Sequence, residues 1–143
     1  MSELIDKLDQ CKLTEVFERR GVVLAYLFGS HARGDAGPLS DVDIAVLFHP
    51  IVAQDERFQR ALQLMGELGS VFGRDDVCVS DLAAASPLLR HRVYYDGRLL
   101  FCSDEAERVR FEVATLRDYV DTEPLRRIKR QYVLQRFEQR NRI

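Results

Sequence analysis

The sequence has few cysteines, no long apolar run and little net charge, and each of these absences disfavours a class of protein. The three cysteines are an odd number, lie far apart and form no Cys-x-x-Cys pair. Disulfide scaffolds and zinc ribbons are therefore disfavoured, and a reducing cytoplasm is the expected compartment. No apolar run approaches the roughly 20 residues of a membrane span, and the N-terminus lacks the pattern of a signal peptide. We therefore expect no membrane partner.

Charge and composition are those of an ordinary folded domain. The chain has 21 Lys and Arg against 23 Asp and Glu, a formal net charge of −2, which argues against direct nucleic-acid binding. Hydrophobic residues make up 46% and charged residues 31% of the 143 residues, which is enough apolar material for one core. Because no repeat or low-complexity linker divides the chain, we predict a single domain over residues 1–143.

A continuous apolar run over residues 22–28 predicts a buried central strand. It ends abruptly at Gly29 and Ser30. Glycine lets a backbone approach a ligand closely, and a serine at the start of a helical turn can offer its hydroxyl and nearby N–H groups to a phosphate. The alternative is an ordinary strand-to-helix turn with Ser30 as a cap. These two residues alone do not decide between the interpretations.

Two carboxylates, Asp41 and Asp43, stand two residues apart at the start of a second apolar run. On a strand this spacing places both side chains on one face, with Val42 and Ile44 on the other. Paired carboxylates repel each other and are costly to desolvate, and a divalent cation such as magnesium would balance their charge. A solvated strand end with two unrelated acids is the alternative.

Together these segments form Gly-Ser, ten residues and Asp-x-Asp within the stretch LFGSHARGDAGPLSDVDIAVLF. This pattern resembles the minimal nucleotidyltransferase family, which belongs to the superfamily related to DNA polymerase beta. The likeness runs from about Leu24 to Phe101. It implies an α/β (α+β) fold with a small mixed sheet flanked by helices, a catalytic core over about 22–102 and C-terminal helices over about 103–143. The family's motif residues map to Gly29, Ser30, Asp41 and Asp43.

The resemblance also implies a third carboxylate on a later strand, as a metal ligand or base. The expected strand is 76–80, where Asp76 and Cys78 share one face by the two-residue period. An ungapped comparison with the family can put Cys78 at the acid's position, with Asp76 one step earlier on the same face. Our candidate is Asp76. Arg33, after the Gly-Ser turn, could bind a triphosphate or could tether its loop to Asp35.

Members of this family include the antitoxins of HEPN–MNT toxin–antitoxin pairs. The resemblance implies transfer of AMP from ATP, with two Mg²⁺ ions, to a tyrosine of a HEPN ribonuclease toxin. Asp41, Asp43 and Asp76 would be the catalytic and metal-binding residues, and Gly29, Ser30 and Arg33 would bind the nucleotide. Two alternatives stay open, namely an antitoxin that only covers the toxin, and a transferase for a small molecule such as an aminoglycoside.

The remaining segments predict helices. One or two short helices are expected over residues 2–20, an amphipathic helix over 54–72 and another over 86–95. A further helix begins near 103, and its expected buried positions are Ala106, Val109, Val113, Leu116 and Val120. The segment 124–143 carries seven basic residues against one acid. It predicts a solvated helix covering one side of the fold, or else a docking surface for an acidic protein or for RNA.

Overall fold

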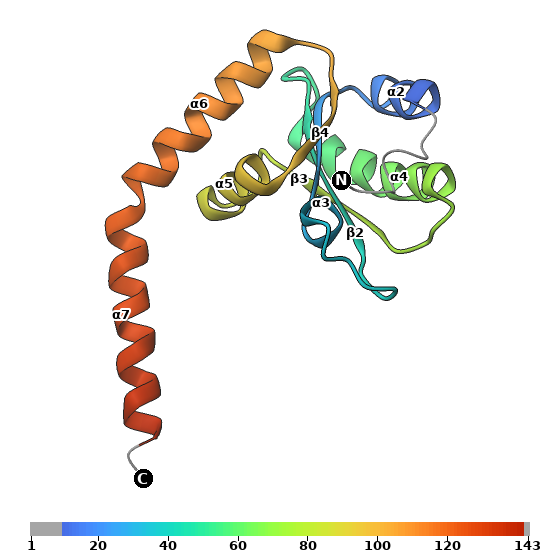
Figure 1. Ribbon diagram of the computed structural model, residues 1–143. Coiled ribbons are helices and arrows are strands. Elements are labelled where there is room, and N and C mark those ends of the chain that lie inside the picture. The colour runs from blue at the N-terminus through green and yellow to red at the C-terminus, as the bar shows by residue number, and fades with distance from the viewer. Residues whose placement is uncertain (1–9, 142–143) are drawn as a thin grey trace.

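The computed structural model describes residues 10–141 as a four-stranded sheet with helices on both faces, followed by an arm of two helices (Figure 1). The elements in chain order are α2 (Gln10–Arg19), β1 (Val22–Phe28), α3 (Ser30–Arg33), β2 (Val42–Phe48), α4 (Gln54–Phe72), β3 (Val77–Asp81), α5 (Pro87–Asp96), β4 (Arg98–Cys102), α6 (Glu105–Asp121) and α7 (Glu123–Arg140). This mixture of helices and a small sheet confirms the predicted fold class.

The sheet has the strand order β3-β2-β1-β4. β1 is antiparallel to both β2 and β4, whereas β2 and β3 are parallel. The register pairs Phe28, the last residue of β1, with Asp43 near the start of β2. Asp43 in turn pairs with Cys78 near the start of β3. The end of β1 and the starts of β2 and β3 therefore meet at one end of the sheet.

Both faces of the sheet are buried, which explains why β1 is apolar almost throughout. One face packs against α2 and α4 in a core that includes Phe17, Ile44 and Leu64. The opposite face packs against α5 and α6 around Tyr26 and Val93. The alternation along β2 places Val42, Ile44 and Val46 in the first core, as predicted from the two-residue period.

The helix predicted over 54–72 is confirmed with these bounds, and it ends where Gly73 adopts a left-handed conformation with φ 68°. Its buried residues are Ala61, Leu64, Leu68 and Gly69. Leu64 is fully buried, whereas Phe58 and Leu62 lie on the solvent side. Of the helices expected over residues 2–20, α2 is present, and residues 2–9 lie outside the described part of the chain.

The predicted buried face of α6 is wrong. The α6 stripe, which we define as Ala106, Val109, Val113, Leu116 and Val120, is exposed. The buried residues of α6 are Phe111 and Thr115. Spacing alone did identify an apolar stripe, but the domain packs against the other side of the helix. The stripe therefore faces solvent.

The C-terminal helix α7 continues from α6 and extends away from the sheet (Figure 1). It contains no buried residue. The sequence predicts a solvated helix that covers one side of the fold. The helix is present and solvated, but it does not cover the fold. No helix among residues 10–141 is long and apolar enough to cross a membrane.

Candidate active site

The turn after β1 brings the backbone close to a carboxylate. Gly29 has φ 75° and ψ −155°, a conformation that side chains rarely allow. A Cβ atom built on Gly29 would lie 2.5 Å from Oδ2 of Asp43. Glycine is therefore required here for two reasons, the backbone angle and the space taken up by Asp43. The Gly-Ser turn and the carboxylate strand, joined only by spacing in the sequence, are in contact in the structure.

Ser30 is the first residue of the short helix α3. Backbone N–H groups at the start of a helix can bind an anion where the turn itself does not supply an acceptor. Ala32 and Arg33 donate their N–H groups to the carbonyl of Gly29, both at 3.2 Å. The turn thus places Ser30 directly after Gly29, whose backbone approaches Asp43. Nucleotide binding by Gly29 and Ser30 stays a prediction.

Asp41 and Asp43 stand on either side of Val42, the first residue of β2. Asp41 is exposed and Asp43 is partly buried. Burial raises the pKa of the Asp43 carboxyl above its ordinary value of 3.8, and the charge of Asp41 raises it further, while His31 and Arg33 act in the opposite direction. The site thus holds negative charge that its own cations do not balance.

This charge state fits a divalent cation. Magnesium takes oxygen ligands, uses one or two protein carboxylates and completes its shell with water and substrate phosphates. Asp41 and Asp43 supply such a pair, and the nearby Gly-Ser turn can place phosphates beside it. In the described part of the chain, no three His, Cys, Asp or Glu side chains are grouped closely enough to hold a metal ion.

Asp76, the predicted third carboxylate, is held by an arginine. Arg74 donates from Nε to Oδ1 of Asp76 at 2.7 Å and from Nη2 to Oδ2 at 2.6 Å. These hydrogen bonds lower the pKa of Asp76. Asp76 also precedes β3, which begins at Val77 rather than at 76 as predicted. The three expected ligands are therefore not grouped as one set, and the role of Asp76 stays a prediction.

Cys78, the alternative at this position, lies directly opposite Asp43 in the parallel β2–β3 register. Cys78 is exposed as a whole residue. Partial desolvation of its thiol raises the thiol pKa, and the three carboxylates of the predicted site raise it further. The residue nearest the Asp43 carboxylate on this strand is thus a neutral thiol, which is a weak ligand for magnesium.

The carbonyl of Ser40, just before Asp41, accepts contacts from two other segments. Nη2 of Arg74 donates to it at 2.8 Å, and Nε2 of His31 lies 3.2 Å from it. The turn that delivers Asp41 is therefore tied both to α3 and to the segment before β3. The sequence shows neither contact, because the Ser40 carbonyl lies nine residues from His31 and 34 from Arg74 along the chain.

Arg33 forms an ion pair with Asp35, which is one of the two arrangements expected from the sequence. Its Nε lies 3.3 Å from Oδ2 of Asp35, and both side chains are well exposed. An exposed ion pair of this kind is weak, so Arg33 can turn to a phosphate without a large loss of stability. Binding of the nucleotide by Arg33 remains a prediction.

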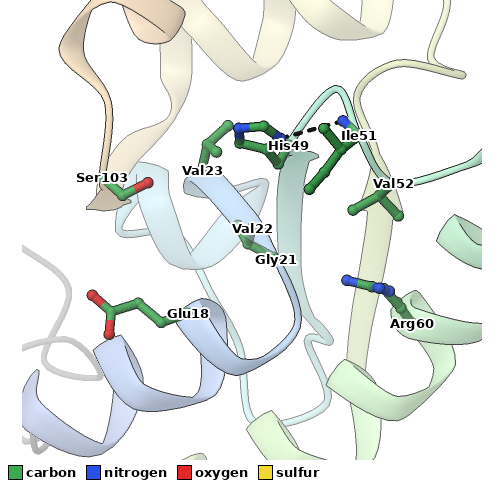
Figure 2. Close-up of a pocket in the computed structure, with 9 residues that line it drawn as sticks. All are labelled: Glu18, Gly21, Val22, Val23, His49, Ile51, Val52, Arg60 and Ser103. Atoms are coloured by element: carbon green, nitrogen blue, oxygen red, sulfur yellow. Dashed lines mark hydrogen bonds between the residues drawn. The ribbon is translucent and has the colours of Figure 1, made fainter.

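A cavity of about 340 Å³ lies at the opposite end of the sheet, lined by Glu18, His49, Arg60 and Ser103 among others (Figure 2). It adjoins the start of β1 and the segments that follow β2 and β4, whereas the carboxylates stand at the start of β2. His49 accepts a hydrogen bond from the Ile51 N–H at 3.2 Å, and Arg60 donates to the Arg20 carbonyl at 2.9 Å. The cavity is separate from the carboxylate site.

The strand order, the Gly-Ser turn and the paired carboxylates define a nucleotidyltransferase core. Residues 11–106 match the family described as polymerase beta, nucleotidyltransferase, and the chain belongs to this family. It is similar to the protein adenylyltransferase MntA of Shewanella oneidensis, with 34% identity over 96 residues. That match covers 67% of this chain and 65% of the relative, so it spans just under two thirds of the relative's length.

Solved structures of toxin–antitoxin complexes contain chains of similar fold. One such complex, crystallised with AMP-PNP, has a chain that superposes with a TM-score of 0.70 and 28% identity, over 89% of this chain and 99% of the other. A second complex pairs the MNT antitoxin with a tri-AMPylated HEPN toxin from Shewanella oneidensis. Its matching chain has a TM-score of 0.64 and 26% identity, over 94% of this chain and 99% of the other.

Proposed function

We propose that this protein is an antitoxin that transfers AMP from ATP to a tyrosine hydroxyl of a HEPN ribonuclease toxin in the cytoplasm. The observation that carries the proposal is the contact between the Gly29 turn and Asp43, because it joins a phosphate-binding turn to a carboxylate pair suited to a divalent cation. The relatives support the acceptor, since one is named a protein adenylyltransferase and another was solved with an AMPylated toxin.

In this reaction the tyrosine oxygen bonds to the α-phosphorus of ATP, the bond to the bridging oxygen breaks, and pyrophosphate leaves. Ser30 and the N–H groups after Gly29 hold the outer phosphates, and Arg33 adds a charge-assisted hydrogen bond. Asp41 and Asp43 would hold Mg²⁺, which would offset the charge on the phosphate oxygens. The hydroxyl proton passes to a base, for which Asp76 is the candidate, once it is released from Arg74.

A second candidate function is neutralisation by binding alone. The observation that favours it concerns the third carboxylate of the proposed site. Asp76 is hydrogen-bonded to Arg74, and the residue opposite Asp43 is Cys78, which has no carboxylate. If this arrangement abolishes catalysis, the chain would act by covering the toxin. The two functions differ in whether the acceptor becomes covalently modified.

The deciding experiment is intact mass spectrometry of a cognate HEPN toxin, sought first as the product of the neighbouring gene, after incubation with this protein, ATP and magnesium. We expect a gain of one or more AMP units, lost when both Asp41 and Asp43 are replaced by asparagine. A stable complex with no mass gain would overturn AMP transfer and establish the binding function. Toxicity assays in cells with the same double variant give an independent readout of neutralisation.

The third position makes a separate prediction. We expect Cys78→Asp to lower the magnesium concentration needed for half-maximal transfer, because a carboxylate opposite Asp43 adds an oxygen ligand. Cys78→Ser, which adds no charge, should leave transfer within about twofold of wild type, since surface substitutions change little. A magnesium titration of the transfer rate measures both effects. Equal magnesium requirements in the two variants would show that this position does not contact the metal.

Asp76 is tested in the same titration. If it supplies the third carboxylate, Asp76→Asn should lower the transfer rate at saturating magnesium, and Cys78→Asp should restore part of that loss. If Cys78→Asp restores nothing and Arg74→Gln lowers the rate as strongly as Asp76→Asn, Asp76 acts by positioning Arg74 against the Ser40 carbonyl.

A further inference from the structure

We propose that the arm formed by α6 and α7 is the docking surface for the protein acceptor, and that it binds an apolar, acid-rimmed surface on that partner. This inference rests on the proposed function, because it names where the acceptor binds. It begins from a feature that the domain itself does not explain, namely an apolar helix face turned toward solvent.

The α6 helix is apolar on two opposite sides. Phe111 and Thr115 are buried against the domain. The members of the α6 stripe recur at alternating spacings of three and four residues, and a helix turns by about 100° per residue, so they form one band opposite Phe111. Its four larger members are between 41 and 68% exposed. A 3-4 spacing of this kind is the seam by which one helix packs against another.

The α7 helix repeats the pattern nearer the C-terminus. Leu125, Ile128 and Tyr132 follow the same spacing and are each more than half exposed. In proteins most of the stability of a helix comes from packing of its apolar face, and α7 buries no side chain in the described chain. A partner that covers these residues would supply the missing apolar contact.

Contacts around Arg126, at the junction of α6 and α7, give the arm a defined direction. Arg126 donates to the Tyr119 carbonyl at 2.7 Å, to Thr122 Oγ1 at 2.5 Å and to Glu123 at 2.8 Å. Its guanidinium lies 3.8 Å from the centre of the Tyr119 ring. Tyr119 in turn stacks on His91 of α5 at 3.6 Å. These contacts hold α7 on α6 and α6 on the domain, so the direction of the arm is fixed before a partner arrives.

A groove beside the α6–α7 junction provides a place for a side chain of the partner. It has a volume of about 290 Å³ and lies between the start of α5 and the start of α7, with apolar walls from Pro87, Leu88 and Leu125. Lys129 lies on the same groove. Interfaces depend on a few large side chains seated in such pockets. This groove suits an apolar side chain with a carboxylate next to it.

Charge argues against two copies of this chain that pack along their α7 helices. α7 carries six basic residues and two acidic ones, so two copies of α7 packed along each other would repel. An acidic surface is attracted instead, and basic flanks then raise the association rate. The apolar residues between the charges favour a protein partner over RNA. The superposition on a chain of the toxin–antitoxin structure with AMP-PNP covers 89% of this chain. The residues left out are fewer than those of α6 and α7 together, so the superposed region includes part of the arm.

The experiment measures binding apart from catalysis. The Asp41→Asn, Asp43→Asn double variant serves as the background, and isothermal titration gives its Kd for the cognate HEPN toxin. Val113→Glu on α6 and Leu125→Glu on α7 are each expected to weaken binding at least about tenfold. Phe58→Glu on α4, equally apolar and exposed, is the matched control and should leave the Kd unchanged.

A charge test separates electrostatic from apolar contributions. Arg127→Glu with Arg130→Glu should weaken binding more at low salt than at high salt. With the catalytic aspartates intact, Val113→Glu and Leu125→Glu should raise the KM for the toxin while kcat at saturating toxin stays within about twofold. Circular dichroism of each variant confirms that α7 remains helical.

Three results would overturn docking on the arm. The first is an unchanged Kd in both arm variants. The second is an effect of Phe58→Glu as large as theirs. The third is self-association of the chain alone, measured by light scattering, that Val113→Glu abolishes, since the face would then join two copies. Failure of AMP transfer by the wild type, with arm-dependent binding intact, would instead overturn only the catalytic part of the proposed function.

Discussion

Replacing Asp43 with asparagine is expected to lower AMP transfer at least about a thousandfold, the largest effect of any single substitution in the site. The carboxylate is one of two oxygen ligands suited to the metal, and metal stabilisation of phosphate charge contributes several kcal/mol to such reactions. Initial rates of transfer to the acceptor, measured at saturating ATP and magnesium, give the change. Asp55→Asn, which removes an exposed carboxylate at the start of α4, is the control and should be near wild type.

The same variant is expected to be at least as stable as the wild type in metal-free buffer. Burial and the charge of Asp41 raise the pKa of Asp43, so the folded protein disfavours the charged form, and stability falls as the pH rises through that pKa. Asparagine removes this loss. The stability difference should shrink as the pH falls toward the ordinary aspartate value of 3.8. Thermal unfolding at several pH values measures it, and a strongly destabilised variant would show that Asp43 is structural.

Replacing Gly29 with alanine is expected to reduce transfer at least about a hundredfold and to lower stability by about 1–3 kcal/mol. The new Cβ would lie 2.5 Å from Oδ2 of Asp43, so either the carboxylate or the turn has to move. Both belong to the proposed site, and a displacement of about 1 Å can cost two orders of magnitude in rate. The measurements are transfer kinetics and thermal unfolding of the purified variant.

Gly34 provides the matched control for this prediction. It also has a positive φ, 80°, but a Cβ built on it meets nothing within 4 Å. Gly34→Ala therefore carries the backbone penalty without the clash, and it should lose some stability while keeping most of its activity. If both variants lost activity to the same extent, the effect would come from the backbone of α3 rather than from contact with Asp43.

The sequence by itself determined the local elements and the motif. The unbroken apolar run over 22–28 is a buried strand because it is covered on both faces. The amphipathic segment over 54–72 is a helix with those bounds. The Gly-Ser and Asp-x-Asp pattern identified the family because its residues follow each other at short, regular spacings. Such features depend on neighbours in the chain, and a sequence displays them directly.

Only the tertiary structure decided which residues meet across the fold. Arg74 donates to the Ser40 carbonyl and Cys78 lies opposite Asp43, because the parallel pairing of β2 and β3 brings together segments more than 30 residues apart. The exposed α6 stripe shows the same limit. Periodicity found an apolar band, but burial depends on where the helix docks, and α6 docks through Phe111 and Thr115 on its other side.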